Sequence, residues 1–363
     1  MNELDEYFKS LARPAIRELE PYDATMTCVP KIRLSANENN GGVPEPVLAA
    51  MRKALESGNR YPDSRNSALR SKIASRYGLA PENIITTNGL DGLFTMLGRA
   101  FLDPGDEVIC GECTFSVYAD NARVAGATVK KIPLGADGAQ HPEDFAAAVT
   151  PATKMLFFCN PNNPTGTMAS AVEVRAMLDA IPRHVIVILD EAYIDFSGED
   201  TKASFKLLAD FPNLIITRTF SKMFALAGLR LGWGAAHPKL IDYLYIVREP
   251  YCVTTVAEAG ASAALDETEY VEKTRHQVAA DRAALCELLG SLGVKYTPSR
   301  ANFVLVFPAE KFEPLAEAFA SRGIAVRTMS LRGERMMRIS IGVPEENREV
   351  ERVIKAIFTG SAL

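Results

Sequence analysis

The segment "LIITRTFSKMFALAGLRLGWG" (residues 214–234) is an apolar run that leads directly into the pair Ser221–Lys222, and Arg230 follows the lysine by eight residues. Almost every neighbour of Lys222 in this segment is apolar or small. Desolvation and nearby positive charge lower the pKa of a lysine amine from its ordinary value of ~10.4, which makes the amine a usable nucleophile. An isolated Ser-Lys pair more often opens a surface helix, so the interpretation depends on the rest of the chain.

Four other apolar runs also end in a cluster of polar residues or glycines. They are rich in Ile, Val, Leu and Phe without alternation, which is typical of strands buried on both faces of a sheet. Helix-period segments such as "SAVEVRAMLDAI" (residues 170–181) lie between them, and this order indicates an α/β fold around a mostly parallel sheet. Because ligands bind beyond the carboxyl ends of such strands, the clusters predict one shared pocket. The four runs are "NIITT" before "NGLDG", "EVIC" before "GECTF", "MLFFC" before "NPNNPTG" and "VIVIL" before "DEAY".

The character of the sequence changes after about residue 250. A long helical stretch, residues 267–293, is followed there by fewer strands and at least one hairpin-like pair. We therefore expect a large domain over residues 34–250 and a smaller α+β domain over residues 251–363. Residues 1–33 have no evident core of their own, and we expect them to form an arm that packs on the small domain or on a partner subunit.

Composition narrows the possible partners. The 363 residues carry a net charge of −5 without a basic block, which argues against a nucleic-acid surface. No apolar stretch is long enough to cross a membrane, and the acidic, amphipathic opening residues are unlike a secretory signal, so we expect the cytoplasm. Cys110 and Cys113 form a C-x-x-C motif that would suit a redox pair or half a zinc site. No second motif completes a metal set, so we expect core or loop cysteines and no metal.

Pyridoxal phosphate is a carbonyl compound with which a lysine such as Lys222 forms a Schiff base, and the polar clusters offer the groups that this cofactor needs. Its ring nitrogen needs a carboxylate, which Asp190 supplies unless that residue is only a helix N-cap. Its phenolic oxygen needs hydrogen-bond donors, for which Asn163 and Tyr193 are candidates. Its phosphate needs amides at a helix start together with cationic and hydroxyl groups. The candidates are the amides of Leu90 and Asp91, the side chains of Thr219, Ser221 and Arg230, and Phe115 to stack on the ring.

The motifs "SK" followed by "AGLR", "NPNNPTG" and "DEAY" closely resemble those of fold-type-I pyridoxal-phosphate aminotransferases. Within that group the chain is most similar to the histidinol-phosphate aminotransferase family, which it matches nearly end to end from "LEPYD" to "MRISIG". The resemblance implies a large domain with a mostly parallel seven-stranded sheet sandwiched by helices. It also implies a homodimer with active sites at the interface, in which Tyr61 of "NRYPD" reaches the cofactor phosphate of the other subunit. Lys222, Asp190 and Tyr193 would then be catalytic.

The resemblance also implies where the substrates bind. Strand alternation in "GIAVRTM" and "RMMRISIG" turns Arg327 and Arg338 away from the apolar faces of their strands, although solvated surface arginines would show the same pattern. In the resembling family Arg338 would hold the carboxylate of glutamate. Arg327 and Arg338, helped by Tyr22, would hold the phosphate of histidinol phosphate, and Asn37 would also contact substrate. The implied reaction is a ping-pong amino transfer from histidinol phosphate to 2-oxoglutarate, with the freed lysine moving the proton.

Three other functions stay open at the level of sequence. They are an aromatic or broad-specificity aminotransferase, a decarboxylase of a phosphorylated amino acid such as threonine phosphate, and a non-catalytic ligand-binding regulator that kept the fold. The last is disfavoured by the intact set of Lys222, Asp190 and Arg230, and a dehydrogenase by the absence of G-x-G-x-x-G after a strand. Two departures from the family pattern concern the site. "NENNGG" replaces N-E-N-P-Y-G, and Leu90 and Gly92 stand where a small residue and a glutamate are usual.

Overall fold

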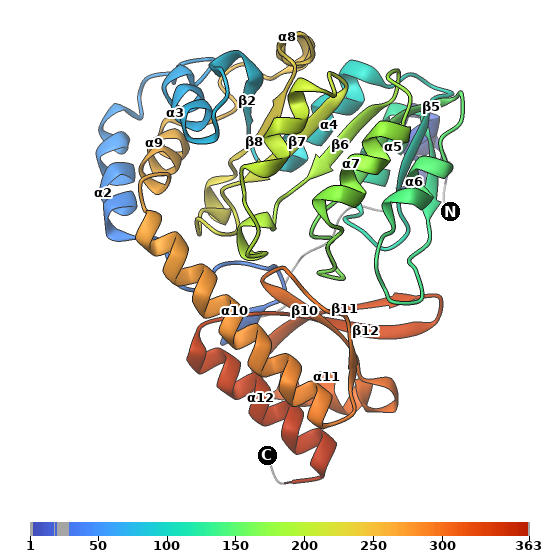
Figure 1. Ribbon diagram of the computed structural model, residues 1–363, viewed down its shortest axis with the longest axis vertical. Helices are drawn as coiled ribbons and strands as arrows, with labels where there is room; N and C mark the ends of the chain where they lie inside the picture. Colours follow the sequence, from blue (N-terminus) through green and yellow to red (C-terminus); the bar gives the residue numbers. More distant parts are fainter. Residues whose placement is uncertain (1–2, 18, 20–28, 362–363) are drawn as a thin grey trace.

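The computed structural model describes residues 3–17, 19 and 29–361, and these form a large unit and a small unit (Figure 1). The large unit is built on a seven-stranded sheet and the small unit on a five-stranded one. Helix α10 (Thr268–Ser291) runs from the large unit down to the small unit in Figure 1. The predicted architecture, a mostly parallel seven-stranded sheet between helices with a smaller C-terminal α+β part, is confirmed.

The large sheet contains seven strands, which are β2 (Ile84–Thr87), β3 (Glu107–Gly111), β4 (Thr128–Ile132), β5 (Thr153–Cys159), β6 (Ile186–Asp190), β7 (Leu214–Thr219) and β8 (Gly232–Ala236). Their order is β2-β8-β7-β6-β5-β3-β4. Strand β8 runs antiparallel to both β2 and β7, and the other neighbouring pairs are parallel. Every residue of β2, β6 and β7 is buried, as expected for apolar runs without alternation.

Helices cover both faces of this sheet. Successive residues of a strand point to opposite faces, so strands that are apolar along their whole length need a cover on each side. Leu156 and Phe158 of β5 belong to one apolar core, whereas Met155 and Phe157 of the same strand belong to another. The helices of the first core include α3 (Ser67–Tyr77), α6 (Pro142–Ala147) and α7 (Ala171–Ala180). Those of the second core are α4 (Leu90–Phe101), α5 (Val117–Ala125) and α8 (Pro238–Val247). With both faces covered, the carboxyl ends of the strands are the part of the sheet left to build a site.

The small unit is a mainly antiparallel sheet backed by helices. Its strands, in spatial order, are β1 (Ile32–Leu34), β11 (Ile324–Leu331), β12 (Glu334–Ser340), β10 (Phe303–Phe307) and β9 (Lys295–Tyr296). Helices α11 (Phe312–Ser321) and α12 (Pro344–Thr359) bury Leu315, Val353 and Ile354 in the same core as Ile339 of β12. Strands β11 and β12 form a hairpin in which Arg327 lies directly opposite Arg338.

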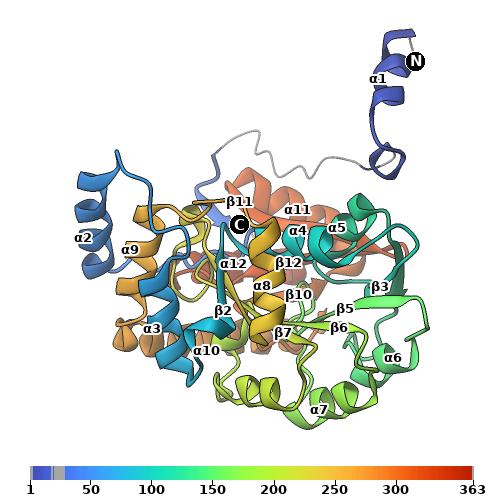
Figure 2. The ribbon, with the colours of Figure 1, turned by 90° about the horizontal axis from the view of Figure 1, so that it is seen from above.

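Of two elements near the predicted domain boundaries, one packs with the small unit and the other with the large unit. Strand β1, at the end of the predicted arm, pairs in parallel with β11 and so adds an edge strand to the small sheet. Helix α9 (Thr255–Ala264) lies beside α2 (Glu45–Ala54) on the large unit, although it follows the boundary predicted at residue 251. Helix α1 (Glu3–Leu11) stands apart from the body of the molecule in Figure 2. The packing of the arm on a partner subunit stays a prediction.

Candidate active site

A cavity of about 840 Å³ is lined by residues of both units. On the large unit its wall consists of residues that follow β2, β3, β5, β6 and β7, the same five strand ends that the sequence singles out. Residues of β11 and β12, together with Arg33 and residues 35–38, line its other side. The sequence-predicted residues in the wall are Asn37, Leu90, Asp91, Phe115, Asn163, Asp190, Tyr193, Thr219, Ser221, Lys222, Arg230, Arg327 and Arg338.

Lys222 follows β7 and lines the cavity with its side chain. Its Nζ donates a hydrogen bond of 2.9 Å to the carbonyl oxygen of Ala36 and lies 5.7 Å from the centre of the Tyr193 ring. Burial, reinforced by the positive charge of Arg338, lowers the pKa of Lys222 to about 8. The neutral amine is therefore far more populated near neutral pH than in an exposed lysine, as a nucleophile or a base requires.

Asp190 is the last residue of β6, and only 3% of its surface is exposed. Burial raises the pKa of its carboxyl group to about 6. Two hydrogen bonds oppose this effect by favouring the carboxylate. The Tyr118 hydroxyl donates one of 2.5 Å to Oδ2, and the backbone N–H of Ala192 donates one of 3.0 Å to Oδ1. The site therefore contains a buried carboxylate that is held in one orientation from both sides.

Tyr118 is a site residue to which no sequence motif points. This residue is wholly buried, and its ring stacks on Phe157 with 4.6 Å between ring centres. It follows Phe115 by three residues, and the two rings meet edge to face. The spacing is compatible with one helical turn, but nothing local in "TFSVY" indicates that the hydroxyl reaches a carboxylate 72 positions further on.

Tyr193 connects the large unit to the segment after β1. Its hydroxyl oxygen accepts a hydrogen bond of 3.0 Å from Nδ2 of Asn37. Burial raises the pKa of Tyr193 to about 12, so the hydroxyl keeps its proton at neutral pH. Asn37 is itself buried with a φ of 55°, and its Oδ1 accepts a hydrogen bond of 2.9 Å from the hydroxyl of Ser340. The two units and their connecting segment thus meet at the cavity.

The start of α4 has the features of an anion site. The first amides of a helix, here including those of Leu90 and Asp91, have no intrahelical acceptor. Gly89 precedes them and offers no side chain to cap them. Arg230 lies beside them, with Nη2 3.3 Å from Oδ2 of Asp91 and Nη1 3.5 Å from Oγ of Ser221. Gly89 has a φ of 85°, and a Cβ there would lie 2.7 Å from Nη2 of Arg230. The backbone conformation therefore favours glycine at this position, and a Cβ there would displace the guanidinium group of Arg230.

Two arginines of the small sheet face the opposite side of the cavity. Arg338 is buried, and it donates hydrogen bonds of 2.5 Å to Oδ1 of Asn163 and to the carbonyl oxygen of Ser35. Arg327 is exposed, and no described residue forms an ion pair with it. The interpretation of Arg338 as a solvated surface residue does not fit its burial.

Two predicted residues are not in the cavity wall. Tyr61 is 82% exposed and stacks on Tyr251 with 4.6 Å between ring centres. Its contact with the cofactor of another subunit stays a prediction. Tyr22 lies outside the described residues, so its predicted place at the substrate also stays a prediction.

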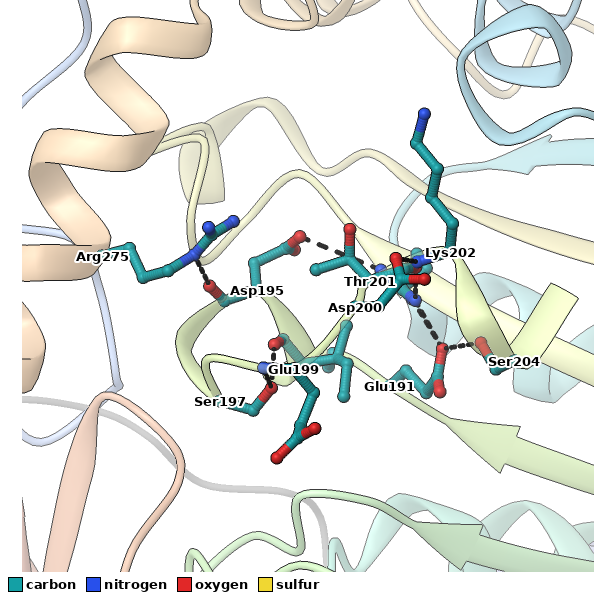
Figure 3. A network of polar contacts seen from close by, with 12 residues as sticks. Glu191, Asp195, Ser197, Glu199, Asp200, Thr201, Lys202, Ser204 and Arg275 are labelled. Carbon is teal, nitrogen blue, oxygen red and sulfur yellow. Dashed lines mark hydrogen bonds and ion pairs between the residues drawn. The ribbon is translucent and has the colours of Figure 1, made fainter. Parts of the chain in front are cut away.

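A buried ion pair that no sequence motif indicates joins the ends of β6 and β7 next to the cavity. Nε and Nη2 of Arg218 donate hydrogen bonds of 2.9 and 2.6 Å to Oε2 of Glu191, and the two side chains are 3% and 5% exposed. In Figure 3 the Ser204 hydroxyl also reaches the Glu191 carboxylate, and Arg275 of α10 bonds the backbone oxygen of Asp195. Because Glu191 follows Asp190 and Arg218 lies four residues before Lys222, the pair fixes the two strand ends that carry the site.

The two cysteines of the C-x-x-C motif lie in β3 and shortly after it. Cys110 and Cys113 carry free thiols, and burial raises the pKa of each to about 11. Such thiols are scarcely ionised at neutral pH and are poor nucleophiles. Within the described part of the chain, no three His, Cys, Asp or Glu side chains are grouped to bind a metal ion. No helix among residues 3–17, 19 and 29–361 is long and apolar enough to cross a membrane.

Comparison with known proteins gives consistent matches along the chain. A family model described as "Aminotransferase class I and II" matches residues 29–357. A histidinol-phosphate aminotransferase of Symbiobacterium thermophilum is 35% identical over 357 residues, covering 96% of this chain and 98% of that protein. One of Methylobacillus flagellatus is 38% identical over 329 residues, covering 90% and 89%. The crystal structure of a histidinol-phosphate aminotransferase from Sinorhizobium meliloti with pyridoxal-5'-phosphate superimposes with a TM-score of 0.89 at 25% identity, covering 97% of this chain and 98% of that one.

Proposed function

The chain belongs to the class I and II aminotransferase family, whose members depend on pyridoxal phosphate, and from that premise we propose that it transfers the amino group of histidinol phosphate to 2-oxoglutarate. One observation carries the proposal. A single cavity holds a lysine amine of lowered pKa and a buried carboxylate on one side, and two arginines on the other. This pairing suits a cofactor enzyme whose substrates carry an anionic group remote from the reacting amine.

The residues in the cavity fit the cofactor. A buried carboxylate such as Asp190 is costly without a positively charged partner, and a protonated ring nitrogen would be that partner. Asn163 and Tyr193 would bind the phenolic oxygen, and Phe115 would stack on the ring. The phosphate would be bound by the amides of Leu90 and Asp91 and by the side chains of Thr219, Ser221 and Arg230. When bound, the cofactor supplies an electron sink for the negative charge that develops beside the substrate nitrogen.

Lys222 is the group that moves the proton. Its amine, with a pKa of about 8, can take a proton at Nζ from the donor's reacting carbon and later return it. Tyr193 keeps its own proton and so acts as a hydrogen-bond donor rather than a base. Asn37 holds the Tyr193 hydroxyl in place through the bond of 3.0 Å. The carbonyl of Ala36, 2.9 Å from Nζ, offers an acceptor for the amine whenever it is not engaged with cofactor or substrate.

The small sheet supplies the substrate contacts in this proposal. Arg338 would hold the carboxylate of glutamate, and Arg327 with Arg338 would hold the phosphate of histidinol phosphate. Planar guanidinium groups bind carboxylate and phosphate with similar geometry, which lets one cavity accept both co-substrates in turn. Tyr22 and Asn37 would add contacts at the same end. The alternating use of one site predicts ping-pong kinetics.

The proposal includes a homodimer. Tyr61 is 82% exposed beside Tyr251, which is 42% exposed, and a second subunit would cover this stacked pair and bring Tyr61 to its cofactor phosphate. Burial of two exposed aromatic rings is a typical contribution to such an interface. The cytoplasmic location stays a prediction from the sequence.

The test is a set of single half-reactions with the cofactor-loaded enzyme. Histidinol phosphate, histidinol, phenylalanine, tyrosine and threonine phosphate are supplied separately, and conversion of the cofactor is followed by absorbance. We expect the highest kcat/KM with histidinol phosphate and release of the matching oxo product. A preference for phenylalanine or tyrosine would instead assign an aromatic aminotransferase, and release of carbon dioxide from threonine phosphate would assign the decarboxylase. No conversion with any donor would favour the regulator.

A further inference from the structure

Three arginines lie in a row on the face of the small sheet that borders the cavity. Arg338 and Arg327 are directly opposite each other on β12 and β11, and Arg33 of β1 is opposite Ala325, two residues before Arg327. Opposite residues share a face of a sheet, as do residues two apart in one strand, so the three arginines project to the same side. All three line the cavity, as does Ala325. From ordinary strand spacings, the Cβ atoms of Arg33 and Arg327 are about 8 Å apart, with only the Ala325 methyl group between them.

Within this row, Arg327 has no ion-pair partner among the described residues. Like charges that face each other across a strand pair destabilise a sheet. Arg327 lies directly opposite Arg338, so the charge of Arg327 is placed beside a second guanidinium group. Arg33 has a carboxylate partner, Glu38, whose Oε2 is 3.1 Å from its Nε. A ligand with more than one negative charge would relieve the repulsion along the row.

We propose that Arg33 determines specificity by binding the phosphate of the amino donor together with Arg327, and that the phosphate displaces Glu38 from Arg33. This inference rests on the proposed function, because it concerns the substrate of the same site. A phosphate monoester carries a charge of about −1.5 to −2 at pH 7 and has three acceptor oxygens, so it can bind two guanidinium groups at once. Glutamate places only a singly charged carboxylate at this end. When glutamate binds, Glu38 keeps Arg33 paired, and Arg33 contributes nothing to that substrate.

The geometry of Glu38 suits this exchange. Its side chain lines the same cavity and is 30% exposed, while that of Arg33 is 49% exposed, so the pair lies at a solvent-accessible edge of the site. Ion pairs at such exposed positions contribute little and are easily replaced by a stronger anion. The exchange therefore lets one cavity bind a dianionic and a monoanionic substrate end without moving the sheet.

The first test compares Arg33→Gln with wild-type enzyme. The quantity measured is the phosphate preference, defined as kcat/KM for histidinol phosphate divided by kcat/KM for histidinol. Loss of a charge-assisted contact is expected to lower this preference by about 10- to 100-fold, while KM for glutamate changes by less than about 2-fold. Arg33→Lys keeps the positive charge but loses the planar, two-pronged guanidinium group, so its phosphate preference should lie between those of wild type and Arg33→Gln. Binding of inorganic phosphate to the cofactor-loaded enzyme, measured by calorimetry, should weaken in parallel.

Two further variants complete the test. Glu38→Gln removes the competing carboxylate and should raise the phosphate preference by about 2- to 5-fold, opposite in sign to Arg33→Gln. Arg52→Gln is the matched control, because Arg52 forms an exposed ion pair of 2.5 Å with Glu45 on α2, outside the cavity wall. It should leave both substrates unaffected.

The outcomes separate this inference from the proposed function. A wild-type enzyme with no phosphate preference would contradict the proposed function itself. A wild-type preference that Arg33→Gln leaves unchanged, or an equal loss for histidinol phosphate and glutamate, would overturn only the role of Arg33. A fall of the preference in Arg33→Gln together with a rise in Glu38→Gln supports the exchange.

Discussion

Replacing Tyr118 with phenylalanine tests how the protein controls the ionisation of Asp190. The substitution removes only the hydroxyl group that donates the 2.5 Å hydrogen bond to the carboxylate. The ring itself packs against Phe94, Phe115 and Phe157, and phenylalanine preserves these contacts. Any effect on cofactor binding therefore comes from the lost hydrogen bond rather than from repacking.

The size of the effect follows from the strength of that bond. A hydrogen bond to a charged group contributes about 1.5–3 kcal/mol, and one pKa unit corresponds to about 1.4 kcal/mol. Because the bond favours the carboxylate, its loss should move the midpoint of Asp190 ionisation upward from about 6 by roughly 1–2 pH units. Cofactor binding requires Asp190 as a carboxylate. In Tyr118→Phe, Asp190 must therefore lose a proton on binding at pH values where the wild-type Asp190 is already ionised, and this weakens the binding.

The assay is the dissociation constant of pyridoxal phosphate, measured between pH 5.5 and 9 for both proteins by fluorescence quenching at about 10 pH values. The ratio of the two constants cancels the ionisation of the free cofactor. We expect this ratio to be nearly constant at high pH and to rise by about 5- to 50-fold as the pH falls to 6, where the wild-type carboxyl group is itself half protonated. Tyr245→Phe is the control, because the Tyr245 hydroxyl has no hydrogen-bond partner among the described residues and Tyr245 is not in the cavity wall. A ratio for Tyr118→Phe that does not vary with pH would refute the reasoning.

Three further predictions concern stability and the cofactor cradle. In the cofactor-free protein, the pKa of Asp190 is raised from 3.8 to about 6. The free energy of unfolding of wild type should therefore fall by about 3 kcal/mol relative to that of Asp190→Asn as the pH rises from 3.8 to 6. A difference between the two proteins that does not depend on pH would contradict the raised pKa. Gly89→Ala should lower cofactor affinity more than 10-fold, because the new Cβ displaces the guanidinium group of Arg230. Gly78→Ala is the control, since Gly78 has a φ of 71° and open space around it, and it should cost only about 1–2 kcal/mol of stability without changing cofactor affinity. Equal losses of cofactor affinity in both variants would argue against a phosphate site at Gly89 and Arg230. Glu191→Gln removes the nearer carboxylate partner of buried Arg218 and leaves only Asp195, at 3.9 Å, so it should cost about 3 kcal/mol in urea unfolding. Glu45→Gln at an exposed pair should cost less than about 1 kcal/mol, and similar losses would show that burial does not matter here.

The sequence could predict those site residues whose position follows from the pattern of a single segment. Asp190 and Lys222 each come at or just after the end of an apolar run, and parallel strands bring such ends to one edge of the sheet. Strand alternation likewise predicted that Arg327 and Arg338 each point away from the apolar face of their strand, and the structure places the two directly opposite each other in the hairpin. In these cases the local pattern and the fold class together determine the position of the side chain.

The parts that escaped prediction depend on contacts between distant segments. Tyr118 meets Asp190 across 72 positions, and the acceptor of the Lys222 amine lies 186 positions away at Ala36. Arg218 lies in the run "LIITR", where a buried arginine is not expected unless its partner Glu191 is known. The contact expected of Tyr61 requires a second chain, so no single-chain pattern can reveal its geometry. Such contacts follow from how loops and helices pack, which periodicity does not encode.

The central claim is that the amine of Lys222 is the group to which the cofactor is attached. Borohydride reduction of the cofactor-loaded protein makes such a link permanent, and peptide mass spectrometry then locates the added mass. We expect the modified peptide to contain Lys222, and we expect Lys222→Ala to retain no cofactor after reduction and unfolding. Attachment at another lysine, or retention of the reduced cofactor by Lys222→Ala, would contradict it.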